Sequence, residues 1–593
     1  MNNAKVLDTE CYKDYWLLSL KCVRTNKVRE FELYEGHPLD RQSITKIMNN
    51  NLTVSFNGNG YDLAMITAAL KGWSNENLKK LSDKIILSGK AIWTVCREHK
   101  LFIPKEWDHI DLIQVAPGAA SLKIYGGRLH SKKLQDLPID PDESITPELR
   151  PLMRSYCIND LDTTIDLFKA LEKPLKLRVE MSELYGIDLR SKSDAQIAEA
   201  VLNSELRNIG VDVGKNPIDE GTVFKYKPPS FIKFKSDKLK EMFCTVIDAE
   251  FVVQESGQVK LPKTLNKAID FDGAKYKFGI GGLHSQEKSQ VVECGDDDFL
   301  YEADFASYYP FIILGEQFYP EHLGEGFLKV YNDIVQKRIE AKRTGDKSTA
   351  DSLKISINGS FGKLGSKYST LYSPNLLIQT TVTGQLCLFM LIEAVTALGA
   401  KVVSANTDGI VIHCNKSIYS DVGQALFNFE LISGYTLEET FYKAIYSRDV
   451  NSYCAIKTDK SIKGKGAYAS GGLMKNPNNN ICISAVKSYL VSGVNIEHTI
   501  MSCSDITQFV AVRQVTGGAI YDGENLGKAV RFYHSLRGKG LTYKKNGNKV
   551  PTSDGCKPLM NLPDTLPNDI DYGWYIKESL ELLSKLGYNE GVH

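Results

Sequence analysis

The sequence predicts a multidomain protein that combines α/β and α+β folds. The chain has 593 residues, and at about 150 residues per domain this length corresponds to roughly four domains with several hydrophobic cores. Apolar residues make up 42% of the chain and charged residues 24%, which are ordinary globular values and exclude a disordered or fibrous protein. Strand-like and helix-like segments alternate in the N-terminal part, as they do in α/β units.

The N-terminal part places acidic residues on predicted strands and helices. Residues 1–30 contain two strand-like stretches, residues 51–70 combine a loop (NGNGYD) with a helix, and residues 150–172 have a helical pattern. Asp8 and Glu10 stand two apart on the first strand and therefore point to one face.

Tyr156 and Asp160 stand four apart on the last of these helices and share a face of it. Asp62 follows the loop NGNGYD. If the four carboxylates Asp8, Glu10, Asp62 and Asp160 converge, they would bind two divalent cations, because hard cations prefer oxygen ligands. The tyrosine would then orient an attacking water molecule, and Asp111 is a candidate for a structural or secondary role.

The rest of the chain contains a Pro-, Lys- and Phe-rich stretch and four patterned segments. The stretch KYKPPSFIKFK (225–235) breaks the alternation and indicates a boundary. After it we expect a strand entering a turn at 299–310 and a long charged helix at 327–357, interrupted near 343–348. Two strands joined by a turn should follow at 401–414, and an amphipathic helix at 575–586.

Two aspartates in this part suggest a second metal site. Asp304 ends an apolar strand in YEADFASYYP, and Asp408 lies at a hairpin tip in SANTDGIVI. Aspartates on neighbouring strand ends can bridge two Mg²⁺ ions roughly 3.5–4 Å apart, which activate a hydroxyl and stabilise a leaving pyrophosphate. Lys354 on a facing helix, in KISINGSFGKLG, would neutralise phosphate charge.

These motifs resemble two known enzyme families. DTE, NGNGYD and YCIND, in this order, are similar to the three motifs of the DEDD 3′–5′ exonucleases of the tyrosine subtype. DFASYYP, KISINGSFG and TDG resemble motifs A, B and C of the B-family DNA polymerases. The resemblance implies an RNase H-like exonuclease domain joined to a right-hand polymerase with palm, fingers and thumb.

The resemblance also implies a role for each matching residue. Asp304 and Asp408 would be the metal-binding catalytic aspartates of the polymerase, and Asp8, Glu10, Asp62 and Asp160, with Tyr156, those of the exonuclease. The nucleotide would be bound by Arg338, Lys342, Lys354, Asn358, Ser307 and Tyr309, the last of which would reject a 2′ hydroxyl. DNA would be bound by Gly281, Gly282, Tyr453, Lys463, Lys465, Asn57 and Tyr61.

Several positions depart from the family pattern. In motif C, Asn406 replaces the first acid and Gly409 replaces the usual serine. The segment FGIGGLHS lacks the usual tyrosine two residues before Gly281, and Asn451 stands where a lysine is usual ahead of Tyr453. We expect the two changes in motif C to affect metal affinity more than activity, because Asp408 is the essential aspartate of that motif.

The implied domain order follows the motifs. The exonuclease would occupy residues 1–172, and a connecting region with the start of the palm 173–290. The palm with motif A would follow at 291–326 and the fingers at 327–366. The palm would continue with motif C and the primer-grip region at 367–470, and the thumb would occupy 471–593. The exonuclease motif begins within ten residues of the N-terminus, which resembles compact phage or plasmid members. Asp304 to Lys354 spans 50 residues and Gly362 to Asp408 spans 46, which leaves little room for the insertions of protein-primed relatives.

The expected activity is DNA-directed DNA synthesis from a primer with 3′–5′ proofreading. It would use two Mg²⁺ per active site, with Mn²⁺ as an alternative, and its partners would be primer-template DNA and dNTPs. We expect a monomer with no membrane contact, and replisome partners that the sequence does not identify. Two alternatives remain, namely an exonuclease with a weak or specialised polymerase half, and a DNA-binding scaffold with degenerate sites.

Charge and cysteine content refine this expectation. Lys plus Arg and Asp plus Glu both number 72, yet residues 441–550 contain 16 basic and 6 acidic residues, and 531–550 contain no acid. A duplex-binding surface requires such a basic region. The twelve cysteines form no CxxC pair, which is typical of a reduced, intracellular protein without zinc knuckles. The N-terminus has no signal-peptide pattern, and the longest apolar run, 386–392, is too short to span a bilayer. We therefore expect a cytoplasmic, phage-encoded enzyme.

Overall fold

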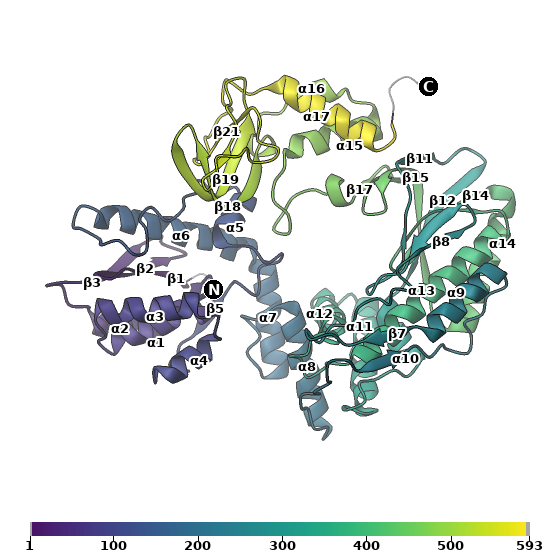
Figure 1. Ribbon diagram of the computed structural model, residues 1–593, viewed down its shortest axis with the longest axis horizontal. Coiled ribbons are helices and arrows are strands. Elements are labelled where there is room, and N and C mark those ends of the chain that lie inside the picture. The colour runs from purple at the N-terminus through teal and green to yellow at the C-terminus, as the bar shows by residue number, and fades with distance from the viewer. Residues whose placement is uncertain (1–2, 589–593) are drawn as a thin grey trace. The chain divides into compact units, whose positions relative to one another are not determined.

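The computed structural model describes residues 3–588, and the chain divides into two compact units (Figure 1). The first unit contains the chain up to Ser193 together with Gly471–Ile481 and Ile500–Ile576. The second contains Asp194–Ser470, Cys482–Thr499 and the described residues from Lys577 onward. The range 471–593, expected to be one thumb domain, is therefore shared between the units.

A five-stranded mixed sheet forms the centre of the first unit. Its order is β3-β2-β1-β4-β5, with β1, β2 and β3 antiparallel and with β1, β4 and β5 parallel. The strands are β1 (Lys5–Cys11), β2 (Tyr15–Cys22), β3 (Val28–Tyr34), β4 (Thr53–Ser55) and β5 (His109–Asp111). β1 and β2 lie in the range 1–30, where the alternating pattern predicted strands.

Helices cover both faces of this sheet. One face packs on α1 (Arg41–Asn50), α2 (Asp62–Leu70), α3 (Asn75–Leu87) and α4 (Ile92–Glu98), and the other on α5 (Leu122–Arg128) and α6 (Arg150–Ala170), which is followed by α7 (Glu172–Tyr185). Residues of β1 alternate between these layers, because Leu7 packs with the first group and Val6 with the second. Asp8 and Glu10 are therefore on the α6 face.

A second, antiparallel sheet belongs to the same unit. Its order is β20-β18-β19-β21, and its strands are β18 (Ala511–Tyr521), β19 (Glu524–His534), β20 (Thr542–Tyr543) and β21 (Cys556–Pro558). β18 and β19 are joined by Asp522 and Gly523, both with positive φ (51° and 86°), as a two-residue hairpin turn requires. The sheet packs on α5 through Ile124, Val512 and Ala529.

A ten-stranded antiparallel sheet organises the second unit. Its order is β17-β16-β15-β12-β14-β13-β10-β9-β8, with β11 paired to β15. The strands are β8 (Ala268–Phe271), β9 (Ala274–Lys277), β10 (His284–Ser285), β11 (Gln290–Glu293), β12 (Asp298–Phe305), β13 (Lys401–Asn406), β14 (Gly409–Asn415), β15 (Leu437–Asp449), β16 (Ser452–Lys457) and β17 (Ile462–Gly464).

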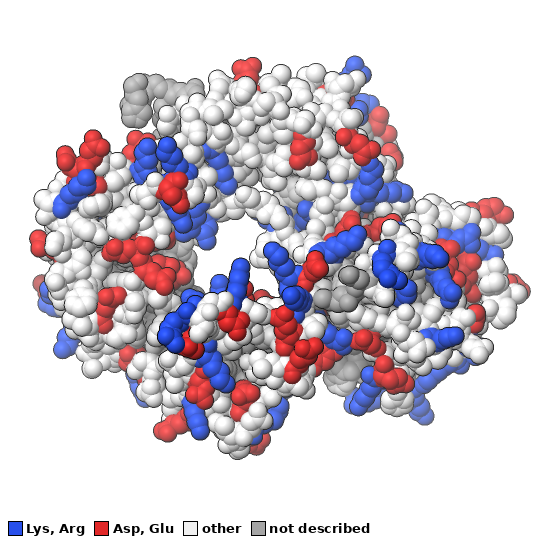
Figure 2. Space-filling view, turned by 180° about the vertical axis from the view of Figure 1, so that it is seen from behind, with Lys and Arg blue, Asp and Glu red and all other residues white. Residues whose placement is uncertain are grey.

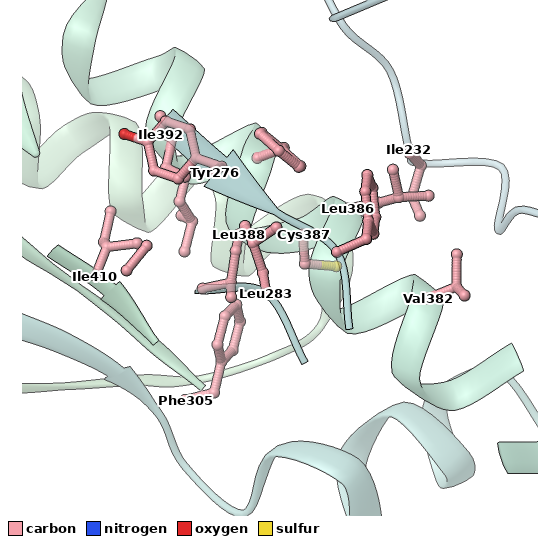
Figure 3. Close-up of a cluster of buried hydrophobic side chains, with 14 of the residues drawn as sticks. Ile232, Tyr276, Leu283, Phe305, Val382, Leu386, Cys387, Leu388, Ile392 and Ile410 are labelled. Atoms are coloured by element: carbon pink, nitrogen blue, oxygen red, sulfur yellow. The ribbon is translucent and has the colours of Figure 1, made fainter. Parts of the chain in front are cut away.

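The core of this unit surrounds one long helix, α13 (Pro374–Thr396). Figure 3 shows its residues Leu386, Cys387 and Leu388 among side chains from the sheet such as Phe305 and Ile410. Other helices against this core are α9 (Asp237–Asp248), α10 (Tyr308–Gly315) and α14 (Lys416–Ser433). By length and hydropathy α13 could cross a membrane, but 89% of its apolar window is buried, as in the core helix of a globular domain.

A group of three helices lies beside the sheet. These are α8 (Asp194–Asn208), α11 (Gly326–Thr344) and α12 (Lys347–Lys363), which contact one another. α11 ends at Gly345 (φ 77°) and α12 begins after Asp346, whose side chain accepts a hydrogen bond from the Thr349 amide. This is the interruption predicted near 343–348.

The remaining elements are short or lie near the C-terminus. They are β6 (Val223–Lys225), β7 (Glu250–Val252), α15 (Asn480–Ser492), α16 (Ile496–Met501), α17 (Tyr572–Lys585) and the 3₁₀ turns η1 (Gly58–Gly60), η2 (Gly466–Tyr468) and η3 (Ile506–Gln508). The stretch 225–235 lies inside the second unit, whereas the chain passes from the first unit to the second at residues 193–194. Basic and acidic side chains are interspersed over the visible face (Figure 2), in keeping with a net charge of zero.

Candidate active sites

The first candidate site lies in the first unit, where β1, α2 and α6 meet. β1 contributes Asp8 and Glu10, α2 begins with Asp62, and α6 contributes Asp160. Asp62 and Asp160 are buried, with 3% and 9% of their surface exposed. The Thr9 hydroxyl donates a hydrogen bond of 2.6 Å to Asp62. The structure therefore brings together the four carboxylates that the motifs predicted.

Burial and mutual repulsion raise the pKa values of these carboxyl groups. The pKa of Asp8 is raised well above its usual range, first by burial and then by Glu10, Asp62 and Asp160. Burial, reinforced by Asp160, raises the pKa of Glu10 to about 8, and burial raises that of Asp62 to about 7. Positive charge would relieve this repulsion. A set of carboxylate oxygens of this kind fits hard divalent cations such as Mg²⁺.

Lys123 and Tyr156 form one edge of this cluster. The Lys123 ammonium, from α5, donates a 2.5 Å hydrogen bond to the Tyr156 hydroxyl and lies 3.2 Å from the Asp160 carboxylate. It also lies 4.5 Å from the centre of the Tyr156 ring. The sequence motifs did not single out Lys123, because only the tertiary packing of α5 on α6 brings it to Asp160.

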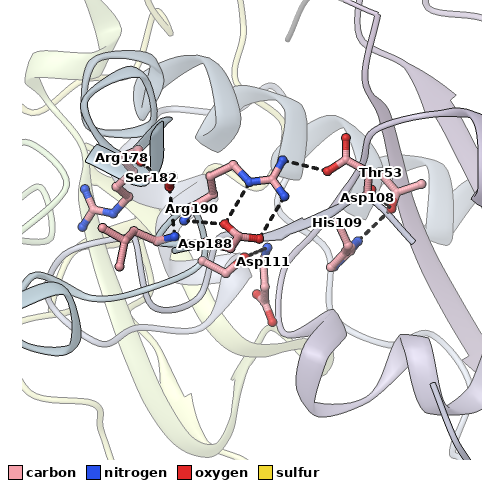
Figure 4. A network of polar contacts seen from close by, with 10 residues as sticks. Thr53, Asp108, His109, Asp111, Arg178, Ser182, Asp188 and Arg190 are labelled. Carbon is pink, nitrogen blue, oxygen red and sulfur yellow. Dashed lines mark hydrogen bonds and ion pairs between the residues drawn. The ribbon is translucent and has the colours of Figure 1, made fainter. Parts of the chain in front are cut away.

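Asp111 fixes the loop that leads to Asp62. Its buried carboxylate accepts hydrogen bonds from the amides of Asn57 (2.8 Å), Asn59 (2.9 Å) and Ile113 (3.0 Å). Its own amide donates to Ser191 at 2.9 Å. Figure 4 shows Asp111 beside the polar network of Arg190, Asp188 and Asp108. Asp111 therefore has a structural role, because its carboxylate positions residues 57–59.

Asn57 and Tyr61 are placed differently from each other. Asn57 is exposed and has a positive φ of 69°, a conformation that asparagine tolerates. The Tyr61 hydroxyl pairs with the Ser82 hydroxyl at 2.7 Å, and its ring packs against the core. Its hydroxyl is therefore held by a residue of α3.

The second candidate site lies in the second unit, at the ends of β12 and β14. Asp304 pairs in register with Gly409, and the Phe305 amide donates a 2.8 Å hydrogen bond to the Asp408 carbonyl. Burial, followed by the neighbouring Asp408, raises the pKa of Asp304 to about 7. Burial likewise raises the pKa of Asp408. The two aspartates are therefore neighbours, as the motifs predicted, and their oxygens also fit a hard-cation site.

A cavity of about 160 Å³ joins these aspartates to basic residues. Its wall includes Asp304, Asp408, Glu302, Asn406, Tyr453, Lys463 and Lys465. Glu302 accepts hydrogen bonds from the Tyr442 hydroxyl (2.5 Å) and from Lys463 (3.2 Å). The sequence reasoning missed Glu302, although it stands two residues before Asp304 on the same strand and so shares its face.

The glycine segment 281–282 contacts this site through Tyr309 and Thr407. The Tyr309 hydroxyl donates a hydrogen bond to the Gly281 carbonyl, and its ring stacks on Phe361 with centroids 4.2 Å apart. A Cβ on Gly282 would lie 2.8 Å from Thr407, the residue before Asp408. Glycine at 282 is therefore required by close packing beneath the hairpin tip.

The expected nucleotide-binding residues are only partly assembled. Arg338 of α11 donates a 3.1 Å hydrogen bond to the Ser307 hydroxyl, at the start of α10. Lys354 and Asn358 are exposed and share a face of α12, and Lys342 is exposed on α11. These last three do not line the cavity that holds Asp304 and Asp408.

Comparison with solved structures finds similarity to the family B DNA polymerase from the hyperthermophilic archaeon Pyrobaculum calidifontis. The TM-score is 0.42 at 13% sequence identity, over 100% of this chain and 78% of that chain. No protein-family model and no curated protein matches the sequence.

Proposed function

We propose that the chain is a DNA-directed DNA polymerase with a 3′–5′ exonuclease. The observation that supports this most is the pairing of Asp304 and Asp408 at adjacent strand ends, in one cavity with Lys463 and Lys465. Nucleotidyl transfer needs carboxylates that bind metal next to cations that bind phosphate. A second carboxylate cluster in the other compact unit supports a separate hydrolytic site.

In the polymerase site, Asp304 and Asp408 would hold two Mg²⁺ ions. Metal ions bound there would supply Lewis acidity and neutralise phosphate charge. The primer 3′ hydroxyl would attack the α-phosphate of a dNTP, and pyrophosphate would leave. Lys463 and Lys465 would attract the primer phosphates, since both line the same cavity. Arg338, Lys342 and Lys354 would attract the triphosphate, and Tyr309 would contact its sugar.

In the exonuclease site, Asp8, Glu10, Asp62 and Asp160 would hold the cations. The Tyr156 hydroxyl would orient the attacking water, and Lys123 would hold that hydroxyl beside Asp160. Removal of a mispaired 3′ nucleotide is the reaction that such a site would contribute to a polymerase.

Primer-template DNA is the proposed substrate, and its binding should depend on salt. The surplus of basic residues in 441–550 supports this. Arg531 is an exception within that region, because it is fully buried and donates hydrogen bonds to the carbonyls of Leu559 and Ser131, both at 2.8 Å.

The decisive first experiment is extension of a primed template with Mg²⁺ and dNTPs, run beside a template-only control. We expect extension only when the primer is present. Absence of any extension, with intact single-strand digestion, would favour the second candidate described next.

That second candidate is an exonuclease with a weak polymerase half, and Asn406 is the observation that favours it. A neutral amide replaces a carboxylate in the wall of the Asp304 cavity. Restoring the charge with Asn406→Asp should then raise extension strongly, by at least tenfold. If the parent is already a full polymerase, the same change should mainly lower the Mg²⁺ concentration needed for half-maximal extension.

A further inference from the structure

The exonuclease site is bordered by residues from a distant part of the chain. A cavity of about 320 Å³ next to Tyr156 and Asp160 is also lined by Gln514 and Lys528. These two residues lie on β18 and β19 of the C-terminal antiparallel sheet. All four belong to the first compact unit.

Specific contacts hold this sheet against residues 131–136 and fix the position of β19. Asp136, which also lines the cavity, accepts a 3.1 Å hydrogen bond from the Lys528 amide. At the neighbouring Gly527 (φ 81°), a Cβ would lie 2.2 Å from the Asp136 side chain. The buried Arg531 further along β19 bonds the Ser131 carbonyl at 2.8 Å. The position of Lys528 relative to Asp160 is therefore set by close packing.

Charged side chains of both signs line the cavity. Asp160 and Asp136 contribute negative charge, while Lys123 and Lys528 contribute positive charge, and Lys123 is already paired with Asp160 at 3.2 Å. Within residues 3–588, the Lys528 ammonium makes no ion pair, whereas Lys549 and Lys557 pair with Asp554 and Asp569. Lys528 and Gln514 are both exposed. A cation without a partner, beside a carboxylate site that would bind metal, is suited to a substrate phosphate.

We infer that the C-terminal sheet forms a wall of the exonuclease site and binds the single-stranded 3′ end of the DNA. Lys528 contacts a backbone phosphate and Gln514 the adjoining sugar or base. Both are positioning residues, because they act on the strand and not on the bond that is cleaved. This inference rests on the proposed exonuclease function, and it assigns to the digested strand a region that the charge pattern alone assigned to the duplex.

The test compares Lys528→Glu and Gln514→Ala with the parent protein. The substrates are a single-stranded oligodeoxynucleotide for digestion and a primed template for extension, each with Mg²⁺. We expect Lys528→Glu to raise the KM of digestion roughly tenfold with kcat nearly unchanged, and to flatten the salt dependence by about one phosphate contact. Gln514→Ala should raise the KM about threefold, and extension should stay at the parental rate.

Lys46→Glu is the matched control. Lys46 is exposed in the same unit on α1, which packs on the opposite face of the five-stranded sheet. The Lys46→Glu substitution reverses the same charge as Lys528→Glu and should leave digestion unchanged. Lys528→Arg should restore most of the parental KM.

Two results would overturn the inference. One is digestion by Lys528→Glu with the parental KM and salt dependence. The other is an equal loss of digestion and extension in that variant, which would assign Lys528 to general DNA binding. If the parent itself does not digest, the proposed exonuclease function fails, and the inference fails with it.

Discussion

Gly409 packs directly against Asp304 in the paired strands β12 and β14. A Cβ built on Gly409 would lie 2.8 Å from the Asp304 Oδ1 and 2.9 Å from the Ala303 carbonyl oxygen. Because one of these atoms belongs to the backbone, a side chain at 409 would displace the strand that carries Asp304. Glycine after Asp408 is thus a packing requirement of this site.

We therefore predict that Gly409→Ala lowers primer extension at least tenfold while single-strand digestion continues. The added methyl group would move the Asp304 carboxylate away from Asp408. Gly423→Ala is the control, because a Cβ there meets no atom within 4 Å and the position lies within α14, where alanine is favoured by roughly 1 kcal/mol. Normal extension by Gly409→Ala would show that the Asp304 position tolerates this displacement.

Lys123→Ala should lower the rate of single-strand digestion about 10- to 100-fold, without effect on primer extension. The change leaves the Tyr156 hydroxyl without its 2.5 Å donor and removes the cation beside Asp160. Steady-state digestion of an oligonucleotide would measure this, and Lys123→Arg should recover part of the rate. A Lys123→Ala enzyme that digests as fast as its parent would refute the assigned role.

Asp111→Ala should destabilise the first unit by about 2–4 kcal/mol and slow digestion. Three backbone amides would lose a charged acceptor. Each such hydrogen bond contributes about 1.5–3 kcal/mol, but burial of the carboxylate, which raises its pKa, offsets a large part of that gain. Chemical denaturation followed by tryptophan fluorescence would measure the loss. Asp40→Ala, which removes the exposed N-cap of α1, should destabilise the protein much less.

His109 predicts a dependence of stability on pH. Burial lowers its pKa to about 4, whereas in an unfolded chain it is about 6.5. The unfolded state therefore takes up the proton first, and stability falls as the pH drops from about 6.5 toward 4. Between pH 7.5 and 5 this group should remove roughly 2 kcal/mol.

His109→Gln should remove that part of the pH dependence, although its stability at pH 7.5 will differ because the contacts with Thr53 and Ser55 change. The comparison is the difference in unfolding free energy between the two pH values in each protein. An identical difference in parent and variant would contradict the assignment of a neutral, buried His109.

Local sequence signals predicted much of this fold. Strand-like patterns in residues 1–30 predicted β1 and β2, and the spacing of four residues placed Tyr156 and Asp160 on one face of a helix. The sequence NTDG predicted the turn between β13 and β14. These features depend on neighbouring residues, so a single sequence reveals them.

Features that depend on distant contacts were not predictable. Lys123 reaches Asp160 only through the packing of α5 on α6, and Lys528 reaches the same cavity from nearly 370 residues further along the chain. Composition also misassigned Arg531, whose charge contributed to a basic run although its guanidinium is buried.

The central claim is that the two carboxylate sites perform two different reactions. The most direct test measures primer extension and single-strand digestion, with Mg²⁺, in Asp408→Asn and in the double variant Asp8→Ala, Glu10→Ala. We predict that Asp408→Asn loses extension and keeps digestion, and that the double variant loses digestion and keeps extension. Normal extension by Asp408→Asn, or loss of both activities in either protein, would contradict the claim.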